Sequence, residues 1–354
     1  MKLTIVLTIK DRVAFTYRWM QYMNDLRCPY RILIADGGKD KEVESHLRYY
    51  PHYPNLDFEY IRYPFDAVIE DYLVKLENVI SRVDTEYILL ADDDDFYLLE
   101  RISEMTAFLD EHKDYVGVRG EQVALTVFDK AGSPTKLPQG EHYLAVSHVV
   151  PSIEDEGRYA RVEMLCGNMS KYYYYANWYS VFRADALQEV WKNLGKLNTK
   201  EVIVWEMLTH ILMVMKGKVK VLSFPFHVRQ SHTSSLGDTL VVGNEFLERA
   251  VINNFLPEFG IAVDEFGEAK TPAERERLLR AVAAWLEAFV SNIYWYRVRV
   301  ESSRLYFFRE VMKNVLLRTH VTRRLYFQMV SWFSSSGQKY PVRLRRIEPY
   351  IILE

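Results

Sequence analysis

The chain has 354 residues, 49% of them hydrophobic and 26% charged, and its formal net charge is −3 at pH 7. This composition predicts a globular protein with one large core or two domains. The two cysteines, Cys28 and Cys166, lack metal-site spacing and form at most one pair. They exclude a disulfide scaffold and favour a reducing cytoplasm. Because the sequence has neither a signal-peptide pattern nor a charge-free apolar stretch of about 18 residues, we expect a soluble or peripheral protein.

The first third of the chain alternates between β-rich and helical segments. We predict strands at residues 3–9, 30–35, 58–63 and 87–91, and helices at residues 13–26, 67–81 and 98–112. The first strand is apolar on both faces, which is typical of a buried parallel strand. This alternation predicts an α/β fold with a mostly parallel sheet flanked by helices.

The pattern changes after residue 115. Residues 116–175 contain short apolar runs and turn residues, and we interpret them as an inserted region over the carboxyl edge of the sheet. Beyond this region we predict a strand at 178–182, helices at 184–194 and 201–216, and a last strand at 219–223. Residues 231–243 are interpreted as a linker to a helical region, whose long helix opens at Pro272.

Four consecutive aspartates, Asp92 to Asp95, follow the apolar strand at 87–91. Adjacent carboxylates repel one another, so clustering them beside a buried strand costs stability unless a cation neutralises them. Mg²⁺ and Mn²⁺ prefer such oxygen ligands. The alternative is a solvated turn or a helix N-terminus, where Asp is also favourable and where Asp95 would act as a cap. We favour the metal site.

Polar groups follow three of the predicted strands, at residues 8–12, at Asp36-Gly37-Gly38 and at Asp92 to Asp95. The carboxyl ends of parallel strands meet at one edge of a sheet, so these groups should converge. Asp36 would accept hydrogen bonds from a base or a ribose, while the glycines let the backbone approach closely. The sequence therefore predicts a nucleotide site in which a cation bridges a pyrophosphate.

The order of these groups, together with the run from Leu90 to Leu99, resembles a family 2 type glycosyltransferase with the GT-A fold over residues 1–235. The resemblance implies that Thr8, Arg12 and Asp36 bind the nucleotide-sugar. It makes Asp94 the main metal ligand, for Mn²⁺ or Mg²⁺. Asp92 and Asp93 would contact the ribose or the metal's waters, with Asp92 as a second candidate ligand.

The same resemblance suggests residues on later elements. A basic residue or Asn in the helix before the acidic strand touches the donor in the family, and Lys75 and Asn78 lie near that place. A solvated helix face is the alternative for both. After the last strand, Arg229 is a candidate phosphate contact and His232 a candidate metal ligand, with His227 as its rival.

Glu206 is the candidate catalytic base. In inverting sugar transfer a carboxylate deprotonates the acceptor hydroxyl. The family places this base in an acidic pair eleven residues before a Gly, and Glu206 has that spacing to Gly217, although Trp205 replaces the first acid. Glu in a helix is ordinarily a surface charge. Here it stands in an apolar segment, where an uncompensated carboxylate is costly to bury.

The region from residue 245 to 354 lies outside the resemblance. From Glu268 onward it carries 16 Lys and Arg against 8 Asp and Glu, with aromatic residues between the arginines. Such helices can lie on an anionic membrane, form a dimer interface or pack onto the catalytic domain, and we favour packing. No nucleic-acid motif is present.

We therefore expect a metal-dependent, inverting glycosyltransferase acting on a glycan or lipid-linked acceptor, cytoplasmic or at the inner face of a membrane. The family's Q-x-x-R-W signature is absent, which argues against a processive synthase. Two alternatives remain. A sugar nucleotidyltransferase would need a glycine-rich loop after the first strand, which residues 8–12 lack, and an inactive binding or scaffold protein would share the fold.

Overall fold

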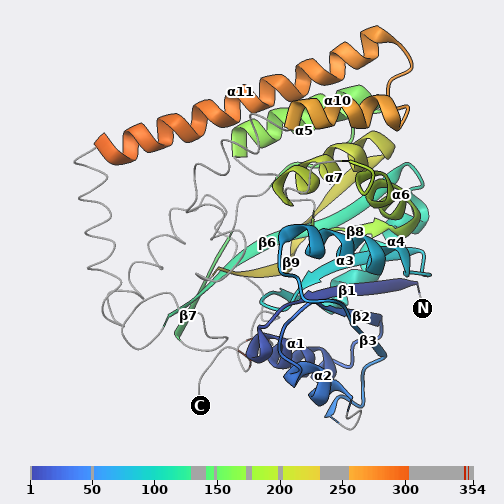
Figure 1. Cartoon of the computed structure of the whole chain (residues 1–354), viewed down its shortest axis with the longest axis vertical. Coiled ribbons are helices and arrows are strands. Elements are labelled where there is room, and N and C mark those ends of the chain that lie inside the picture. Colours follow the sequence, from blue (N-terminus) through green and yellow to red (C-terminus); the bar gives the residue numbers. More distant parts are fainter. Residues whose placement is uncertain are drawn as a thin grey trace.

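The structure is a computed structural model that describes residues 2–48, 52–128, 141–146, 150–172, 178–197, 202–231, 255–302, 347 and 350. Within these residues, nine strands form one sheet in the order β3-β2-β1-β4-β8-β6-β9-β5, and β7 pairs with β6. Helices cover both faces of the sheet (Figure 1). The predicted α/β fold is confirmed.

The first four strands of the sheet are parallel and follow the prediction closely. They are β1 (Leu3–Ile9), β2 (Arg31–Asp36), β3 (Phe58–Arg62) and β4 (Tyr87–Asp92). All seven residues of β1 are buried, as expected of a central strand with helices on both faces. These strands supply the ends on which the predicted nucleotide site depends.

The remaining strands add antiparallel pairings. They are β5 (Phe96–Tyr97), β6 (Tyr115–Phe128), β7 (Glu141–Val146), β8 (Val181–Arg183) and β9 (Lys218–Ser231). Strand β8 runs antiparallel to β4 and β6, and β5 runs antiparallel to β9, whereas β6 and β9 are parallel. The last strand is thus longer than predicted, and it reaches the site.

The interpretation of residues 116–175 as an insertion is wrong. Strand β6 lies inside the sheet between β8 and β9, and residues 158–172 form helix α5 (Arg158–Tyr172). The register between β6 and β9 shifts on either side of Glu121. Gly120 lies there, and a Cβ on it would come within 2.6 Å of the Phe224 carbonyl oxygen. This irregularity interrupts the alternation of buried residues, so one long strand resembles several short ones.

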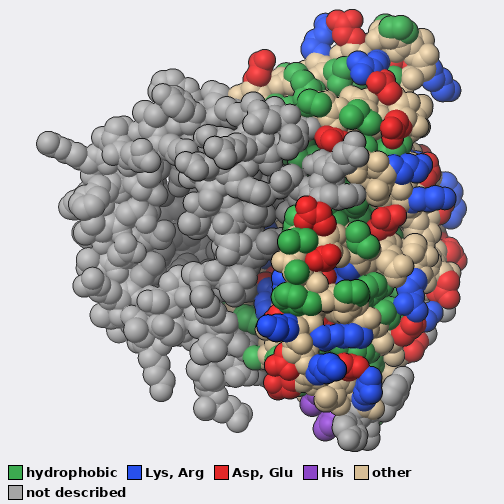
Figure 2. Space-filling view, viewed as in Figure 1, with side chains coloured by type: hydrophobic (Ala, Val, Ile, Leu, Met, Phe, Trp, Pro, Cys, Tyr) green, Lys and Arg blue, Asp and Glu red, His purple; other side chains and the backbone are tan. Residues whose placement is uncertain are grey.

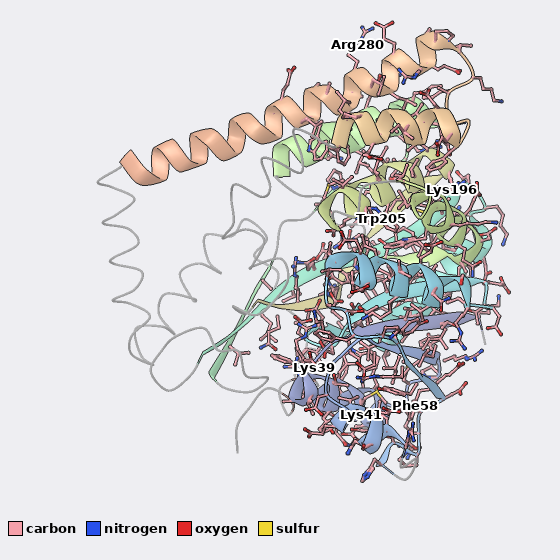
Figure 3. The ribbon with its side chains drawn as sticks, in the orientation of Figure 1. Lys39, Lys41, Phe58, Lys196, Trp205 and Arg280 are labelled. Carbon is pink, nitrogen blue, oxygen red and sulfur yellow. The ribbon has the colours of Figure 1, made fainter. Side chains whose placement is uncertain are left out.

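Two groups of helices enclose the sheet. Helices α3 (Ile69–Ser81), α6 (Ala184–Leu194) and α7 (Val202–Lys216) share one hydrophobic cluster with the sheet. Helices α1 (Val13–Asp25), α2 (Glu42–Leu47) and α4 (Ile102–Glu111), which follows the 3₁₀ turn η2 (Leu99–Arg101), belong to the other cluster. In Figure 3, Trp205 lies in the layer of α6 and α7, where its ring contacts that of Trp191.

The described part of the C-terminal region packs on this body. Helix α11 (Pro272–Ser302) lies along α5, and helix α10 (Leu256–Glu265) packs against α11 (Figure 1). Phe259, Val282 and Trp285 are buried in the same cluster as Leu165 of α5. Figure 2 shows acidic and basic side chains mixed over α10 and α11, and Arg277 pairs with Glu163 at 2.7 Å. Among the described helices, none is both long and apolar enough to cross a membrane.

Candidate active site

The ends of three parallel strands meet at one edge of the sheet. Thr8 of β1 is opposite Ala35 of β2 on one side and Asp92 of β4 on the other, and Ile9 is opposite Asp36. The predicted convergence of these strand ends is confirmed. The backbone register therefore brings the Asp36 loop and the four-aspartate turn to either side of β1.

The turn after β4 gathers three carboxylates. Asp92, Asp94 and Asp95 each offer an oxygen, and these oxygens lie within 4.8 Å of one another. Asp94 and Asp95 are buried, and Asp92 is partly exposed. Asp93 is fully buried and its side chain faces α1, where Thr16 Oγ1 donates to it at 2.9 Å. The turn therefore directs three acids together and one away.

Two arginines near the start of α1 hold this turn. Arg12 pairs with Asp93 at 2.5 Å and with Asp94 at 2.7 Å, and its second nitrogen is 3.5 Å from the other Asp94 oxygen. Arg18 is buried and donates to the Asp94 backbone carbonyl at 2.8 Å and to Gln230 Oε1 at 2.6 Å. A metal ion that takes Asp94 as a ligand must therefore compete with Arg12.

The outer acids of the turn are held by Tyr179, which lies just before β8, and by residues of β9. Tyr179 Oη donates to Asp92 Oδ2 at 2.6 Å. His227 Nε2 lies 2.6 Å from Asp95 Oδ2, and the backbone N–H of Gln230 donates to Asp95 Oδ1 at 3.0 Å. The following 3₁₀ turn has no side-chain cap, so the alternative role of Asp95 as a helix cap is wrong. His232 lies outside the described residues.

Burial disfavours the ionised form of the carboxylates in this turn. Burial and the repulsion of neighbouring carboxylates raise the pKa of Asp92 to about 6. Burial likewise raises the pKa of Asp93 to about 6 despite its pairing with Arg12, and it raises the pKa of Asp95 well above the ordinary value. Three convergent carboxylates, all oxygen donors, fit a hard divalent cation held by Asp92, Asp94 and Asp95.

Asp36 occupies a different environment. Its Oδ1 accepts from the backbone N–H of Gly38 at 2.7 Å, and its Oδ2 accepts from Tyr60 Oη at 2.5 Å and from Arg62 at 2.8 Å. The side chain is 3% exposed. Asp36 therefore orders its own loop and is neutralised by Arg62 from β3.

Lys75 lies behind this loop. It is buried, pairs with Asp66 and donates to the Ile9 carbonyl at 3.2 Å. A Cβ on Gly37 would come within 2.2 Å of the Asp66 carboxyl group, so glycine is required there. Asn78 accepts from Tyr63 Oη at 2.7 Å. The solvated alternative is therefore wrong for Lys75, whose contact with a donor stays a prediction.

Glu206 approaches the turn from α7. It is half-buried beside the buried Trp205 and Met207. Burial raises its pKa to about 7, with Arg229 opposing the shift and Asp92 adding to it. The charges of Asp92, Asp95 and Glu206 all act on Arg229. The candidate base and the candidate metal ligands thus share one electrostatic environment, with Arg229 among them.

Sequence reasoning missed several residues of this site. Tyr179, Arg18 and Gln230 contact the aspartate turn from far along the chain, and no motif or spacing marks them. Tyr72 was missed too. Burial raises its pKa, with Asp92 and Glu206 adding to the shift, and its hydroxyl bonds to Thr8. Only a Tyr at helical spacing facing the strand ends could have indicated it.

No protein-family model matches the chain, and no curated protein matches it either. Solved structures similar to it include S. aureus TarS 1–349 in complex with UDP-GlcNAc, with 12% identity, 96% of this chain and 93% of that chain covered, and a TM-score of 0.43. The mannosyltransferase PcManGT from Pyrobaculum calidifontis, in complex with GDP-Man and Mn²⁺, has 10% identity, coverage of 96% and 88%, and a TM-score of 0.44.

The chain spans about half of the longer S. aureus TarS structure, covering 54% of that chain and 82% of its own length, at 11% identity and a TM-score of 0.41. Similarities at this level leave the function to be argued from the site.

Proposed function

We propose that the chain is a metal-dependent glycosyltransferase that takes a sugar from a nucleotide-sugar donor. The observation that supports this most is the convergence of Asp92, Asp94 and Asp95 within 4.8 Å, one strand away from the Asp36 loop. A nucleoside diphosphate needs a cation for its phosphates and a separate place for its base and ribose. The two sides of β1 supply groups for each.

The residues have separate roles in this proposal. A divalent cation held by Asp94, Asp92 and Asp95 supplies charge stabilisation for the departing diphosphate. Arg12 and Arg229 place positive charge beside the same phosphates. Thr8 and the Asp36 loop face the base and ribose side, and Lys75 supports that loop from behind.

Glu206 is proposed as the base of an inverting transfer. Its carboxylate removes the proton of the acceptor hydroxyl while that oxygen attacks the anomeric carbon. A pKa of about 7 in the metal-free protein keeps the carboxylate basic enough for this task and still ionised at slightly alkaline pH. The acceptor is proposed to be a glycan or a lipid-linked sugar.

A donor panel tests the activity. Purified protein is incubated with UDP-, GDP-, CMP- and dTDP-sugars, with Mn²⁺, Mg²⁺ or EDTA, and release of the free nucleotide is measured. We expect one nucleotide class to be hydrolysed slowly in the presence of metal and not in EDTA. Binding of donors without metal and without turnover would contradict the proposal and favour a scaffold protein. Release of pyrophosphate from a nucleoside triphosphate and a sugar phosphate would favour a nucleotidyltransferase.

A further inference from the structure

The hydroxyl group of Tyr179 is hydrogen-bonded to one carboxylate oxygen of Asp92, a candidate metal ligand. Tyr179 is 7% exposed and lies two residues before the start of β8. It donates to Asp92 Oδ2 at 2.6 Å, a short bond to a carboxylate. A cation that binds both oxygens of Asp92 would therefore have to compete with this hydrogen bond at Oδ2.

The aromatic packing fixes the position of that hydroxyl. The Tyr179 ring lies 4.1 Å from the His227 ring, and the His227 ring is stacked at 5.1 Å on Tyr97. Tyr97 and His227 face each other across the β5–β9 pair. His227 is fully buried and belongs to β9, so the Tyr179 ring packs against a side chain of the sheet. A rotation of Tyr179 away from Asp92 would require this layer to repack.

The same layer constrains a second carboxylate. His227 Nε2 lies 2.6 Å from Asp95 Oδ2, and the Gln230 N–H donates to Asp95 Oδ1. Tyr179 thus orients Asp92, and His227 orients Asp95. Arg12, at the start of α1, pairs with Asp94. Partners of this kind, which contact the ligand and not the metal, commonly change metal affinity by about 10- to 100-fold.

We propose that Tyr179 is a positioning residue that restricts Asp92 to a single oxygen ligand, so that the site selects Mn²⁺ or Mg²⁺ over Ca²⁺. The inference rests on the proposed metal site. Mg²⁺ requires near-octahedral geometry, and it binds one or two carboxylates together with waters and phosphates. Ca²⁺ takes six to eight oxygens and often binds a carboxylate through both of them. Holding Asp92 Oδ2 on Tyr179 therefore removes a ligand that Ca²⁺ would use.

The test is Tyr179→Phe, which keeps the ring in the aromatic layer and removes only the hydroxyl. Mn²⁺ affinity is measured by electron paramagnetic resonance and Ca²⁺ affinity by its competition with Mn²⁺, both without donor. We expect Mn²⁺ to bind about tenfold more weakly and Ca²⁺ about as well as before or better, so the Mn²⁺/Ca²⁺ affinity ratio falls at least tenfold.

Tyr97→Phe is the matched control. Tyr97 belongs to the same layer, but its hydroxyl bonds backbone groups, the Leu90 carbonyl oxygen at 3.4 Å and the backbone of Asp92. Among the described residues it has no hydrogen bond to a carboxylate oxygen of the turn. This variant should keep the wild-type ratio within about twofold. Equal losses in the two variants would mean a general loosening of the layer and would overturn the proposal.

A double-mutant cycle with Asp92→Asn shows whether Tyr179 acts through Asp92. The effect of Tyr179→Phe on the affinity ratio should disappear in the Asp92→Asn background. An effect of the same size in both backgrounds, or an unchanged ratio in Tyr179→Phe, would overturn the inference alone. A wild-type protein that binds no Mn²⁺ would overturn the proposed metal site and this inference with it.

Discussion

The two acidic sides of the site differ in how their charge is neutralised. Asp36 is a single carboxylate whose oxygens accept from Gly38, Tyr60 and Arg62, all within 26 residues along the chain. The turn at Asp92 to Asp95 has four carboxylates, and their partners come from the start of α1, from Tyr179 near β8 and from β9. One acid therefore orders a loop, whereas we propose that the others are arranged for a cation.

The strongest test of this difference removes one acid on each side. Asp94→Asn should abolish Mn²⁺ binding and lower donor turnover by about 1,000-fold, because the cation stabilises the leaving diphosphate. Asp36→Asn should weaken donor binding and leave Mn²⁺ binding unchanged, since Asp36 is not among the convergent carboxylates. Metal titration and turnover measured on both variants check this. A similar loss of Mn²⁺ affinity in both would remove the distinction.

Glu206→Gln should lower the rate of transfer by about 100-fold or more and leave donor and metal binding intact. In the wild type the base acts when ionised, so the rate should rise with pH through about 7 and then level off. The variant should lose that rise. The raised pKa also costs stability. The cost grows between about pH 4.5 and pH 7, where the folded state keeps a proton that the unfolded state has released, and it is complete above pH 7.

Glu206→Gln should therefore melt at a higher temperature than the wild type at pH 8 and at a similar temperature at pH 4. Calorimetry of the metal-free proteins measures this. A variant that transfers sugar at the wild-type rate removes Glu206 from the role of base. Equal melting temperatures at pH 8 would mean that the carboxylate is not held in an environment that raises its pKa.

Gly37→Ala tests the packing around the Asp36 loop through its effect on the stability of the fold. The added Cβ would meet the Asp66 carboxyl group at 2.2 Å and would disturb its buried pair with Lys75. We expect a loss of about 2–3 kcal/mol in the free energy of unfolding, measured in urea. Gly167→Ala on α5 is the control, because no atom of the described part of the chain lies within 4 Å of its Cβ position. Helix propensity predicts a gain of about 0.5–1 kcal/mol there, so equal losses would contradict the account.

Arg12→Gln gives the smallest expected effect. Arg12 forms an ion pair with the Asp94 carboxylate in the absence of metal. Its removal should therefore tighten Mn²⁺ binding about fivefold when no nucleotide is present. Arg62→Gln removes the cation beside Asp36 and should leave Mn²⁺ affinity unchanged. Titration calorimetry compares the two. Weaker Mn²⁺ binding in Arg12→Gln would show that Arg12 supports the metal ligands more than it competes with the ion.

The parts of the site that the sequence predicts are those encoded within one segment. An apolar strand followed at once by Asp92 to Asp95, or by Asp36, places the acid at a strand end whatever the rest of the chain does. Strands β1 to β4 and helix α11 likewise carry their own patterns. Helix α10 was not predicted as a separate element, although Pro257 stands in its first turn.

The parts that the sequence does not predict depend on contacts between distant segments. Arg18 and Gln230 meet 212 residues apart, and Tyr179 reaches Asp92 across 87 residues. The register shift near Gly120 depends on β9, which is far along the chain. Local patterns fix a strand's period but not its partners. Lys75 similarly has the spacing of a donor contact, and only the fold reveals Asp66 beside it.

The central claim is that the turn at Asp92 to Asp95 holds the cation of a nucleoside diphosphate. The most direct test is a crystal structure of the protein with Mn²⁺ and UDP or GDP, using the anomalous signal of manganese. We expect one strong peak within ligand distance of Asp94 and of Asp92 or Asp95, in contact with the diphosphate. A nucleotide bound without manganese at these carboxylates, or manganese bound elsewhere in the chain, would contradict it.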